Sequence, residues 1–308
     1  MTFPILQMAP VRGISDLVYR NSYKDHFSGI DEAVSPFVTT VKGDQLKDSQ
    51  RQQLERSKNK LPVIPQVIGK NADHFIELSR IFEEQGHTAV NWNLGCPHPT
   101  MTRKKCGSGL LQYPDIIDRF LEKVCNNISL SISVKVRLGL ESPGELMNLL
   151  PILNRYPLYE VIIHPRLGKQ MYKGSVDLDS FEQLIPHCTH KIVYNGDIFT
   201  LADFEKISSR FPMIDHFMLG RGLFMNPFLA DQIKCRTCLV EKERLMRFHD
   251  SLFREYAEIL SGPAHIIQRM SGHWEYLHHS FENGKKAYRE IKKAKTLDDY
   301  YRGISLLK

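Results

Sequence analysis

The sequence A-V-N-W-N-L-G-C-P-H-P-T, residues 89–100, reads as a short buried strand that runs directly into a tight turn. Asn91 and Asn93 alternate along the end of this strand, so both side chains point to the same face. Cys96 follows on the turn. Polar amides and a thiol at the end of an apolar strand cost free energy unless they meet a ligand or one another. The stretch therefore predicts either a ligand site or a buried structural cysteine with satisfied amides.

Short apolar segments alternate with amphipathic segments on both sides of this stretch. The segments expected as strands are Ile5–Met8, Glu32–Val34, Val63–Ile68, Ala89–Asn93, Ser131–Arg137, Tyr159–His164, Ile192–Asn195 and His216–Leu219. The helical patterns between them are Asp16–Lys24, Ala72–Gln85, Pro114–Asn126, Gly144–Arg155, Ser180–Ile185 and Leu201–Ser209. This alternation of eight strand segments with helical segments predicts an α/β fold, a (β/α)8 TIM barrel. An open doubly wound sheet is the alternative, but its Gly-rich first turn is missing.

The strand patterns stop after Cys238. Four helical patterns follow, at Val240–Leu260, Ala264–Phe281, Lys285–Lys295 and Leu297–Leu307. We therefore expect a catalytic barrel over residues 1–238 and a small all-helical C-terminal domain over residues 239–308.

The composition is that of a soluble globular protein, with 308 residues, 42% hydrophobic and 25% charged. Since no apolar run approaches the roughly 18 residues of a membrane span and no secretory signal is visible, we expect a cytoplasmic protein without membrane contact. We also expect a monomer. The net charge of +6 is compatible with an anionic partner. Cys235 and Cys238 have the spacing of half a zinc site, but nothing nearby completes it, so no metal site is predicted.

Polar residues and glycines are expected at the carboxyl ends of nearly all the strands, where barrel enzymes place their active sites. One such residue is more often a surface residue, but agreement across seven strand ends indicates a common site. The residues at these ends are Ala9, Pro10, Gln66, Asn91, Asn93, Cys96, Lys135, Arg137, His164, Arg166, Asn195, Gly196, Asp197, Gly220, Arg221 and Gly222.

The last two strand ends predict a phosphate site. N-G-D at 195–197 and G-R-G at 220–222 place backbone N–H groups and a guanidinium before the next helix. Lys135 on the opposite side could stabilise an anionic reduced ring, so the pattern favours flavin mononucleotide (FMN) as cofactor. Cys96 is then the candidate general acid, and Cys106, in a basic Gly-rich loop, is the rival.

The chain resembles the dihydrouridine synthases, flavin enzymes that reduce uridine in transfer RNA. The matching stretches are M-A-P (8–10), Q-V-I-G (66–69), N-W-N-L-G-C-P (91–97), G-S-G-L-L (107–111), S-V-K-V-R-L-G (133–139), I-H-P-R (163–166), Q-M-Y-K-G (170–174), N-G-D (195–197) and L-G-R-G (219–222). They follow the family's order across the barrel and indicate a divergent bacterial-type member.

The resemblance implies a proton donor at Cys96 and a helical domain that helps to bind RNA. It also implies that FMN is held by Gln66, Lys135, His164, Asn195, Gly196, Gly220 and Arg221. Asn93, Arg166 and Tyr172 would face the uracil, and Asn91 is expected to be a substrate contact as well. NADPH would bind transiently as reductant, hydride would pass to C6 of the uracil, and Cys96 would protonate C5.

Further RNA contacts are expected from Arg103, Lys104 and Lys105 and from the basic helix at 285–295, whose alternative is a solvated face. The chain departs from the family pattern at Val11-Arg12, Ser35-Pro36 and Thr100, which bear on substrate contacts. Two other functions stay open: an RNA-binding protein that has lost the reduction, and a flavin reductase of a free pyrimidine.

Overall fold

The computed structural model describes residues 3–39, 46–236 and 240–307. Within them, parallel strands form a single sheet in the order β3-β5-β6-β7-β8-β9-β10-β1-β2-β4. The strands are β1 (Ile5–Met8), β2 (Glu32–Val34), β3 (Val38–Thr39), β4 (Val63–Ile64), β5 (Gln66–Ile68), β6 (Ala89–Leu94), β7 (Ser131–Gly139), β8 (Leu158–Leu167), β9 (Ile192–Tyr194) and β10 (His216–Leu219).

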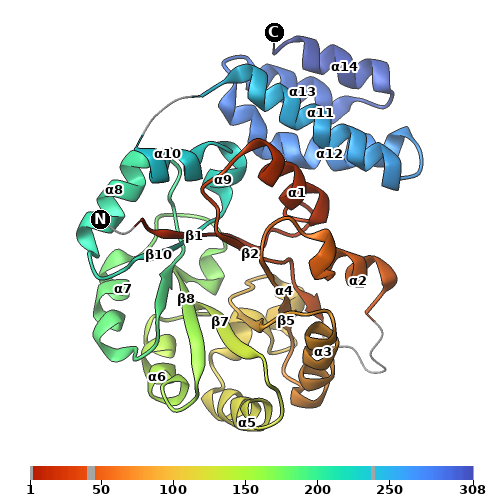
Figure 1. The fold of residues 1–308 in the computed structure, drawn as a ribbon. Helices are drawn as coiled ribbons and strands as arrows, with labels where there is room; N and C mark the ends of the chain where they lie inside the picture. Colours follow the sequence, from red (N-terminus) through yellow and green to blue (C-terminus); the bar gives the residue numbers. More distant parts are fainter. Residues whose placement is uncertain (1–2, 40–45, 237–239, 308) are drawn as a thin grey trace.

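Prolines divide two of the eight barrel strands into halves. β2 and β3 flank Pro36, and β4 and β5 flank Pro65, which has no N–H to donate to a neighbouring strand. Because β2 pairs with β4 and β5 pairs with β6, the two halves β4 and β5 together join the ends of the sheet. The carbonyl of Pro65 still accepts from the Asn91 N–H at 2.8 Å. The predicted eight-stranded barrel is thus confirmed (Figure 1).

Side chains fill the barrel interior in layers. An apolar layer of buried residues crosses the middle of the barrel: Ala9, Val34, Ile64, Ile162, Val193 and Met218. Towards the amino ends of the strands, Gln7 Nε2 donates to Glu32 at 2.8 Å and to the fully buried Glu160 at 3.0 Å. Burial raises the pKa of Glu160 from 4.5 to about 7. Because the lower part of the barrel is filled, the carboxyl ends of the strands are left for a ligand.

Helices surround the barrel and cover the outer faces of the strands (Figure 1). The helices of this part are α1 (Leu17–His26), α2 (Asp48–Leu54), α3 (Ala72–Glu84), α4 (Pro99–Thr102), α5 (Pro114–Cys125), α6 (Gly144–Leu153), α7 (Leu178–Leu184), α8 (Leu201–Arg210), α9 (Arg221–Met225) and α10 (Leu229–Cys235). Their apolar faces pack on the strands: the Trp92 ring of β6, for example, stacks on Phe120 of α5 with centroids 3.8 Å apart.

Four helices form the C-terminal domain: α11 (Lys242–Ile259), α12 (Pro263–Leu277), α13 (Gly284–Lys293) and α14 (Leu297–Ser305). In its core, the Tyr300 hydroxyl accepts from Trp274 Nε1 at 3.0 Å and lies 2.6 Å from His249 Nε2. The expected boundary after Cys238 lies outside the described residues.

The helical domain is fixed to the first helix of the barrel. α11 packs against α1, and the Tyr256 hydroxyl donates to Asp16 Oδ1 at 2.7 Å. Asp16 also caps α1 by accepting from the Tyr19 N–H at 3.0 Å. Arg269 of α12 lies 3.3 Å from the second carboxylate oxygen of Asp16. One half-buried carboxylate therefore both begins α1 and joins the two domains.

Across the described ranges, no helix has the length and apolar character needed to cross a membrane. Nor do the described residues contain a group of three or more His, Cys, Asp or Glu side chains that could hold a metal ion.

Candidate functional site

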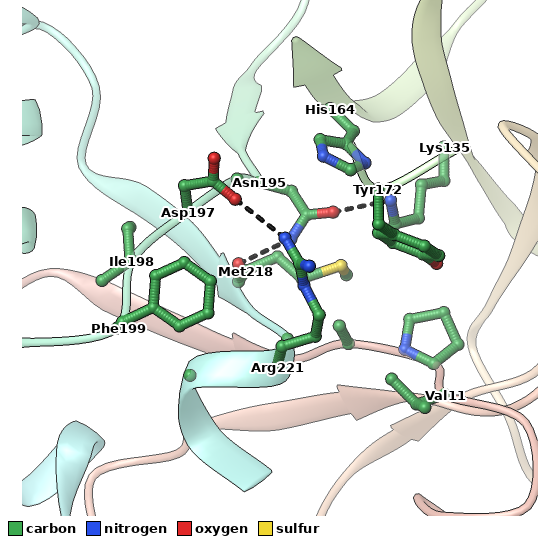
Figure 2. Close-up of a pocket in the computed structure, with 15 residues that line it drawn as sticks. Val11, Lys135, His164, Tyr172, Asn195, Asp197, Ile198, Phe199, Met218 and Arg221 are labelled. Carbon is green, nitrogen blue, oxygen red and sulfur yellow. Dashed lines mark hydrogen bonds and ion pairs between the residues drawn. The ribbon is translucent and has the colours of Figure 1, made fainter. Parts of the chain in front are cut away.

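Two adjoining cavities lie at the carboxyl ends of the strands. The larger, of 360 Å³, is lined by Gln66, Asn93 and Cys96 among others. The smaller, of 80 Å³, is bounded by residues 195–199 and 220–222 (Figure 2). The walls that both cavities share are formed by Pro10, Val11, Lys135, His164 and Tyr172. The cavities therefore form one elongated site across the barrel mouth.

The turn that carries Cys96 is held from both sides. Asn93 Oδ1 accepts from the N–H groups of Gly95 at 3.0 Å and Cys96 at 2.8 Å. Behind the turn, the N–H of Ser108 donates to the Cys96 carbonyl at 3.0 Å. Gly107, with φ of +59°, is required there, because a Cβ would lie 2.5 Å from that carbonyl oxygen. The G-S-G-L-L stretch thus supports the cysteine turn.

The Cys96 thiol lies at the larger cavity, half-buried. Burial raises its pKa, and the nearby cations of Arg137, Arg12 and Lys135 offset only part of this effect. The sulfur therefore keeps its proton at neutral pH. Cys106, the rival from the sequence, is buried and is not among the residues that line this cavity.

Asn91 lies beneath the cavity rather than in its wall. It is fully buried, its Oδ1 accepts from Gln66 Nε2 at 2.7 Å, and its Nδ2 donates to Ser133 Oγ at 2.8 Å. Gln66 Oε1 in turn accepts from Asn93 Nδ2 at 2.8 Å. Both ends of the Asn91 amide are therefore used inside the protein, and the structure does not bring this residue to a substrate.

Lys135 reaches from β7 into the shared wall of both cavities. Its ammonium donates to Asn195 Oδ1 at 2.7 Å, and Asn195 Nδ2 donates to the Met218 carbonyl at 2.8 Å (Figure 2). Burial, and then the positive charge of Arg137, lower the pKa of Lys135 to about 7. An anionic ligand in this wall would favour the charged form.

Arg137 is a buried cation that bonds to backbone carbonyls. Its guanidinium donates to Gly95 O at 3.1 Å, Leu167 O at 2.8 Å and Met171 O at 2.7 Å. It thereby fixes the loop that carries Tyr172, whose ring centroid is 5.4 Å from Arg137 and 5.0 Å from Arg221. Tyr172 therefore stands between two cations where the cavities meet.

Arg166 lies behind the site and is 1% exposed. Its guanidinium forms a two-pronged ion pair with Asp197, at 2.8 and 2.6 Å. Arg221 donates to the same carboxylate at 2.9 Å from the cavity side. Arg166, predicted to face the substrate, is not among the residues that line either cavity, and its bonds support Asp197 and His164, which do.

His164 is held as a neutral ring. Burial and four surrounding cations, first Lys135, lower its pKa well below the usual range. Arg166 Nη1 lies 3.1 Å from His164 Nε2 and can only donate, so this nitrogen accepts and the proton is on Nδ1. The ring thus offers one N–H donor from its Nδ1 side.

G-R-G at 220–222 begins α9 close to the loop after β9. A Cβ on Gly222 would lie 2.0 Å from the Ile198 carbonyl oxygen, so glycine is needed for this approach. α9 has only five residues, and its contribution is therefore the position of Arg221 rather than a long helix dipole.

The structure brings most of the predicted residues together at the mouth. Those that line the two cavities are Ala9, Pro10, Gln66, Asn93, Cys96, Lys135, Arg137, His164, Tyr172, Asn195, Gly196, Asp197, Gly220, Arg221 and Gly222. Arg103, Lys104 and Lys105 are exposed beyond α4, outside these walls. Ser133 was missed, although it alternates with Lys135 and Arg137 along one face of β7.

The departures from the family pattern gather in one wall. Val11, Arg12, Pro36 and Thr100 all line the larger cavity. Ser35 lies just below, where its hydroxyl accepts from the Gln66 N–H at 3.1 Å. The wall around Cys96 is therefore the part of the site that is particular to this chain.

Known proteins resemble this chain in both sequence and fold. The family model described as dihydrouridine synthase matches residues 7–306. A tRNA-dihydrouridine synthase B of Pasteurella multocida is 27% identical over 244 residues, which cover 78% of this chain and 70% of that protein. A probable tRNA-dihydrouridine synthase 2 of Bacillus subtilis is 26% identical over 283 residues, covering 86% and 83%.

Among solved structures, morphinone reductase in complex with tetrahydroNAD has a TM-score of 0.54 at 10% identity, covering 78% of this chain and 88% of that one. The old yellow enzyme from Trypanosoma cruzi has a TM-score of 0.54 at 10% identity, covering 78% and 90%. At this identity the likeness concerns the barrel fold alone.

Proposed function

Because this chain belongs to the dihydrouridine synthase family, we propose that it reduces uridine to 5,6-dihydrouridine in transfer RNA with bound FMN. The observation that carries the proposal is the position of Cys96. Its protonated thiol shares a cavity with Lys135 and His164, and this cavity adjoins the site at Gly196 and Arg221.

The charges of the site fit an anionic, elongated cofactor. Lys135, Arg137, Arg166 and Arg221 are balanced by one carboxylate, Asp197, which already pairs with two of them. No carboxylate lines the larger cavity among the described residues. Buried cations without counter-charges are costly, and a bound phosphate and an electron-rich ring would relieve that cost.

Within this proposal, the phosphate lies at residues 195–197 and 220–222, and the ring lies against Gln66, Lys135 and His164. When bound, FMN would supply the hydride that reduces C6 of the uracil. Lys135 and the Nδ1–H of His164 would hold the ring by donating hydrogen bonds, and Asn195 would orient the Lys135 ammonium.

Cys96 would deliver the proton to C5 of the uracil. Its raised pKa suits an acid that must stay protonated until the reaction. Asn93 would hold the turn that aims the thiol, and Tyr172, exposed at the junction of the cavities, would contact the base. Asn91 and Arg166 would act only by positioning Gln66, Asp197 and His164.

We propose NADPH as the reductant. The sequence contains no G-x-G-x-x-G fingerprint for a separate dinucleotide fold. This supports transient binding of NADPH in the cavity that the uridine enters afterwards.

The RNA contact surface would combine the barrel mouth with the helical domain. Arg103, Lys104 and Lys105 are exposed beside the larger cavity. In the helical domain, α12 reaches the mouth, because Tyr276 packs edge-on against Phe224 of α9 with centroids 5.9 Å apart. Beyond it, His278 stacks on Tyr288 of the basic helix α13, at 4.9 Å and 9°. Stacked rings beside lysines are typical of surfaces that hold unpaired bases.

We propose that the protein acts on transfer RNA in the cytoplasm and as a monomer.

The decisive test is to map dihydrouridine across the RNAs of a strain that lacks this protein. Loss of dihydrouridine at particular transfer RNA positions, restored by the wild-type gene, is the expected result. Purified protein should also carry FMN and form dihydrouridine in that transfer RNA with NADPH. An unchanged map together with a colourless protein would favour an RNA-binding function, whereas reduction of free uracil at a comparable rate would favour a pyrimidine reductase.

A further inference from the structure

A continuous chain of hydrogen bonds crosses three neighbouring strands under the larger cavity. We name it the amide relay; its members are Asn93 and Asn91 of β6, Gln66 of β5 and Ser133 of β7. It starts at the N–H groups of Gly95 and Cys96, which donate to Asn93 at 3.0 and 2.8 Å. It ends where Asn91 donates to Ser133 Oγ at 2.8 Å.

The strand register builds this relay. Gln66 lies opposite Asn91, which lies opposite Ser133, and Asn93 is two residues further along the same face of β6. Gln66 can therefore reach both asparagines with one amide group. All four side chains are less than 10% exposed, so water does not compete for these bonds.

The direction of the relay follows from its first link. A backbone N–H can only donate, so Asn93 Oδ1 must accept, and Asn93 Nδ2 is left to donate to Gln66 Oε1 at 2.8 Å. Gln66 Nε2 must then donate to Asn91 Oδ1 at 2.7 Å, and Asn91 Nδ2 must donate to Ser133. Each amide has only one orientation that satisfies both of its neighbours.

We infer that the backbone of the Cys96 turn sets the orientation of the Gln66 amide, and that Asn91 and Ser133 are positioning residues for it. Gln66 is fully buried at the edge of the larger cavity, and each end of its amide keeps one hydrogen-bonding position that the relay does not use. The relay fixes their order, with the acceptor towards Asn93 and the donor towards Asn91. The matching ligand edge has an N–H beside a carbonyl, as in the imide of a flavin or a uracil. Only the identity of this ligand rests on the proposed function.

One isosteric substitution should reverse the relay. In Asn93→Asp, the carboxylate still accepts from the turn N–H groups but has no hydrogen for Gln66. Gln66 would then flip to donate to residue 93, and Asn91 would flip to donate to Gln66. The Ser133 hydroxyl can donate as well as accept, so every reversed bond is satisfied. Lys135, opposite residue 93 in the register, would compensate the new charge.

The matched substitution one step along the relay should preserve its direction. In Asn91→Asp, the side chain still accepts from Gln66 Nε2, and its second oxygen can accept from Ser133 or, when protonated, donate to it. The two variants make the same chemical change within one strand. They differ in whether Gln66 must flip and in whether the new carboxylate lines the cavity, so the orientation of Gln66 is the readout that decides between them.

The test is to determine neutron structures of the wild type and both variants, and to titrate each with FMN by fluorescence quenching. We expect the Nε2 deuterons of Gln66 to face residue 91 in the wild type and in Asn91→Asp, and residue 93 in Asn93→Asp. FMN affinity should fall about tenfold or more in Asn93→Asp. The reversed Gln66 amide would place its N–H against an N–H of the ligand and its oxygen against a carbonyl oxygen of the ligand. FMN affinity should stay within about threefold in Asn91→Asp. The same Gln66 orientation in all three proteins, or equal losses in both variants, would overturn the inference. A wild type that binds no FMN would instead count against the proposed cofactor, and the deuteron positions would still decide the relay.

Discussion

The Lys135 ammonium lies 2.7 Å from the neutral amide oxygen of Asn195, with no carboxylate among the residues that line its cavities except Asp197. Asp197 is already bonded to Arg166 and Arg221. Lys135 is therefore a half-buried cation supported by a dipole, and its partial burial is the first reason that its pKa falls to about 7.

We expect FMN affinity to depend on pH through Lys135. An anionic ligand stabilises the charged form, so affinity is greatest below pH 7. It then falls by up to about tenfold per pH unit above pH 7, until the raised pKa of the complex is reached. Fluorescence titrations from pH 6 to 9 measure this. In Lys135→Met, affinity at pH 6 should be lower and the decline above pH 7 should vanish. An unchanged decline in the variant would assign it to another group.

Removing the Cys96 thiol should stop protonation while sparing the cofactor. We expect Cys96→Ala to keep the flavin spectrum and its bleaching by NADPH, and to lose about 10²- to 10⁴-fold in dihydrouridine formation. Single-turnover assays on transfer RNA measure this loss. Cys106→Ala, which removes a buried thiol away from the cavity wall, should retain most of the activity. The reverse pattern would make Cys106 the acid.

Asp197→Asn should destabilise the protein without its ligand. The left-handed backbone at this position, with φ of +40°, is tolerated by Asn, so the change removes mainly the charge. Arg166 would be left buried without a counter-charge, at a cost of about 3 kcal/mol in unfolding free energy. Because an added anion can replace the carboxylate, millimolar inorganic phosphate should raise the melting temperature more in the variant than in the wild type. Equal shifts of the melting temperature in both proteins would show that Asp197 does not form part of the phosphate site.

Glu160→Gln should stabilise the protein at high pH only. The pKa of Glu160 is raised from 4.5 to about 7 in the folded state, so the native protein binds more protons than the unfolded chain between these values. Unfolding free energy therefore falls as pH rises through this window. The glutamine removes this penalty, with a gain of about 3 kcal/mol at pH 8 and little change at pH 4. Urea unfolding at both values measures it. As a control, substitution of the exposed Glu205 by Gln should change the unfolding free energy little at either pH. A gain in Glu160→Gln that does not depend on pH would contradict the raised pKa of Glu160.

Substitutions of Lys104 and Lys191 test the proposed RNA contact surface, with Lys191 as the control. Both are exposed, but Lys104 lies beside the barrel mouth and Lys191 precedes β9 at the opposite end. If Lys104 contacts a phosphate, Lys104→Gln should weaken transfer RNA binding and reduce the slope of log affinity against log salt by about 0.7 to 0.9. Lys191→Gln should change neither. Filter binding between 50 and 300 mM salt measures both slopes, and equal slopes in all proteins would exclude Lys104 from the contact.

The barrel strands could be predicted from the sequence because each is a short apolar run between turn residues. Even the short Glu32–Val34 strand is present, and the Val63–Ile68 strand is interrupted only at Pro65. The four C-terminal helices also lie close to their predicted bounds. Their amphipathic patterns and turn residues are local signals, which can be read from the sequence without knowledge of the tertiary contacts.

The roles of individual polar residues could not be read in the same way. Asn91 and Asn93 have the same sequence signal, but one lies beneath the cavity and the other in its wall. Arg166 looks like a ligand-binding residue at a strand end until the fold brings Asp197, 31 residues away, in front of it. Such pairings depend on register and on contacts across the barrel, which periodicity does not encode.

Asp16 also has a consequence for the order in which the chain folds. It begins the first helix, yet its partner Tyr256 lies 240 residues further along. During synthesis, α1 is made long before α11 exists, so its cap carboxylate must stay hydrated until nearly the whole chain has been made. Contacts of such sequence separation are slow to form. The docking of the helical domain is therefore expected to be a late step of folding, and the barrel reaches its final packing only when the helical domain is complete.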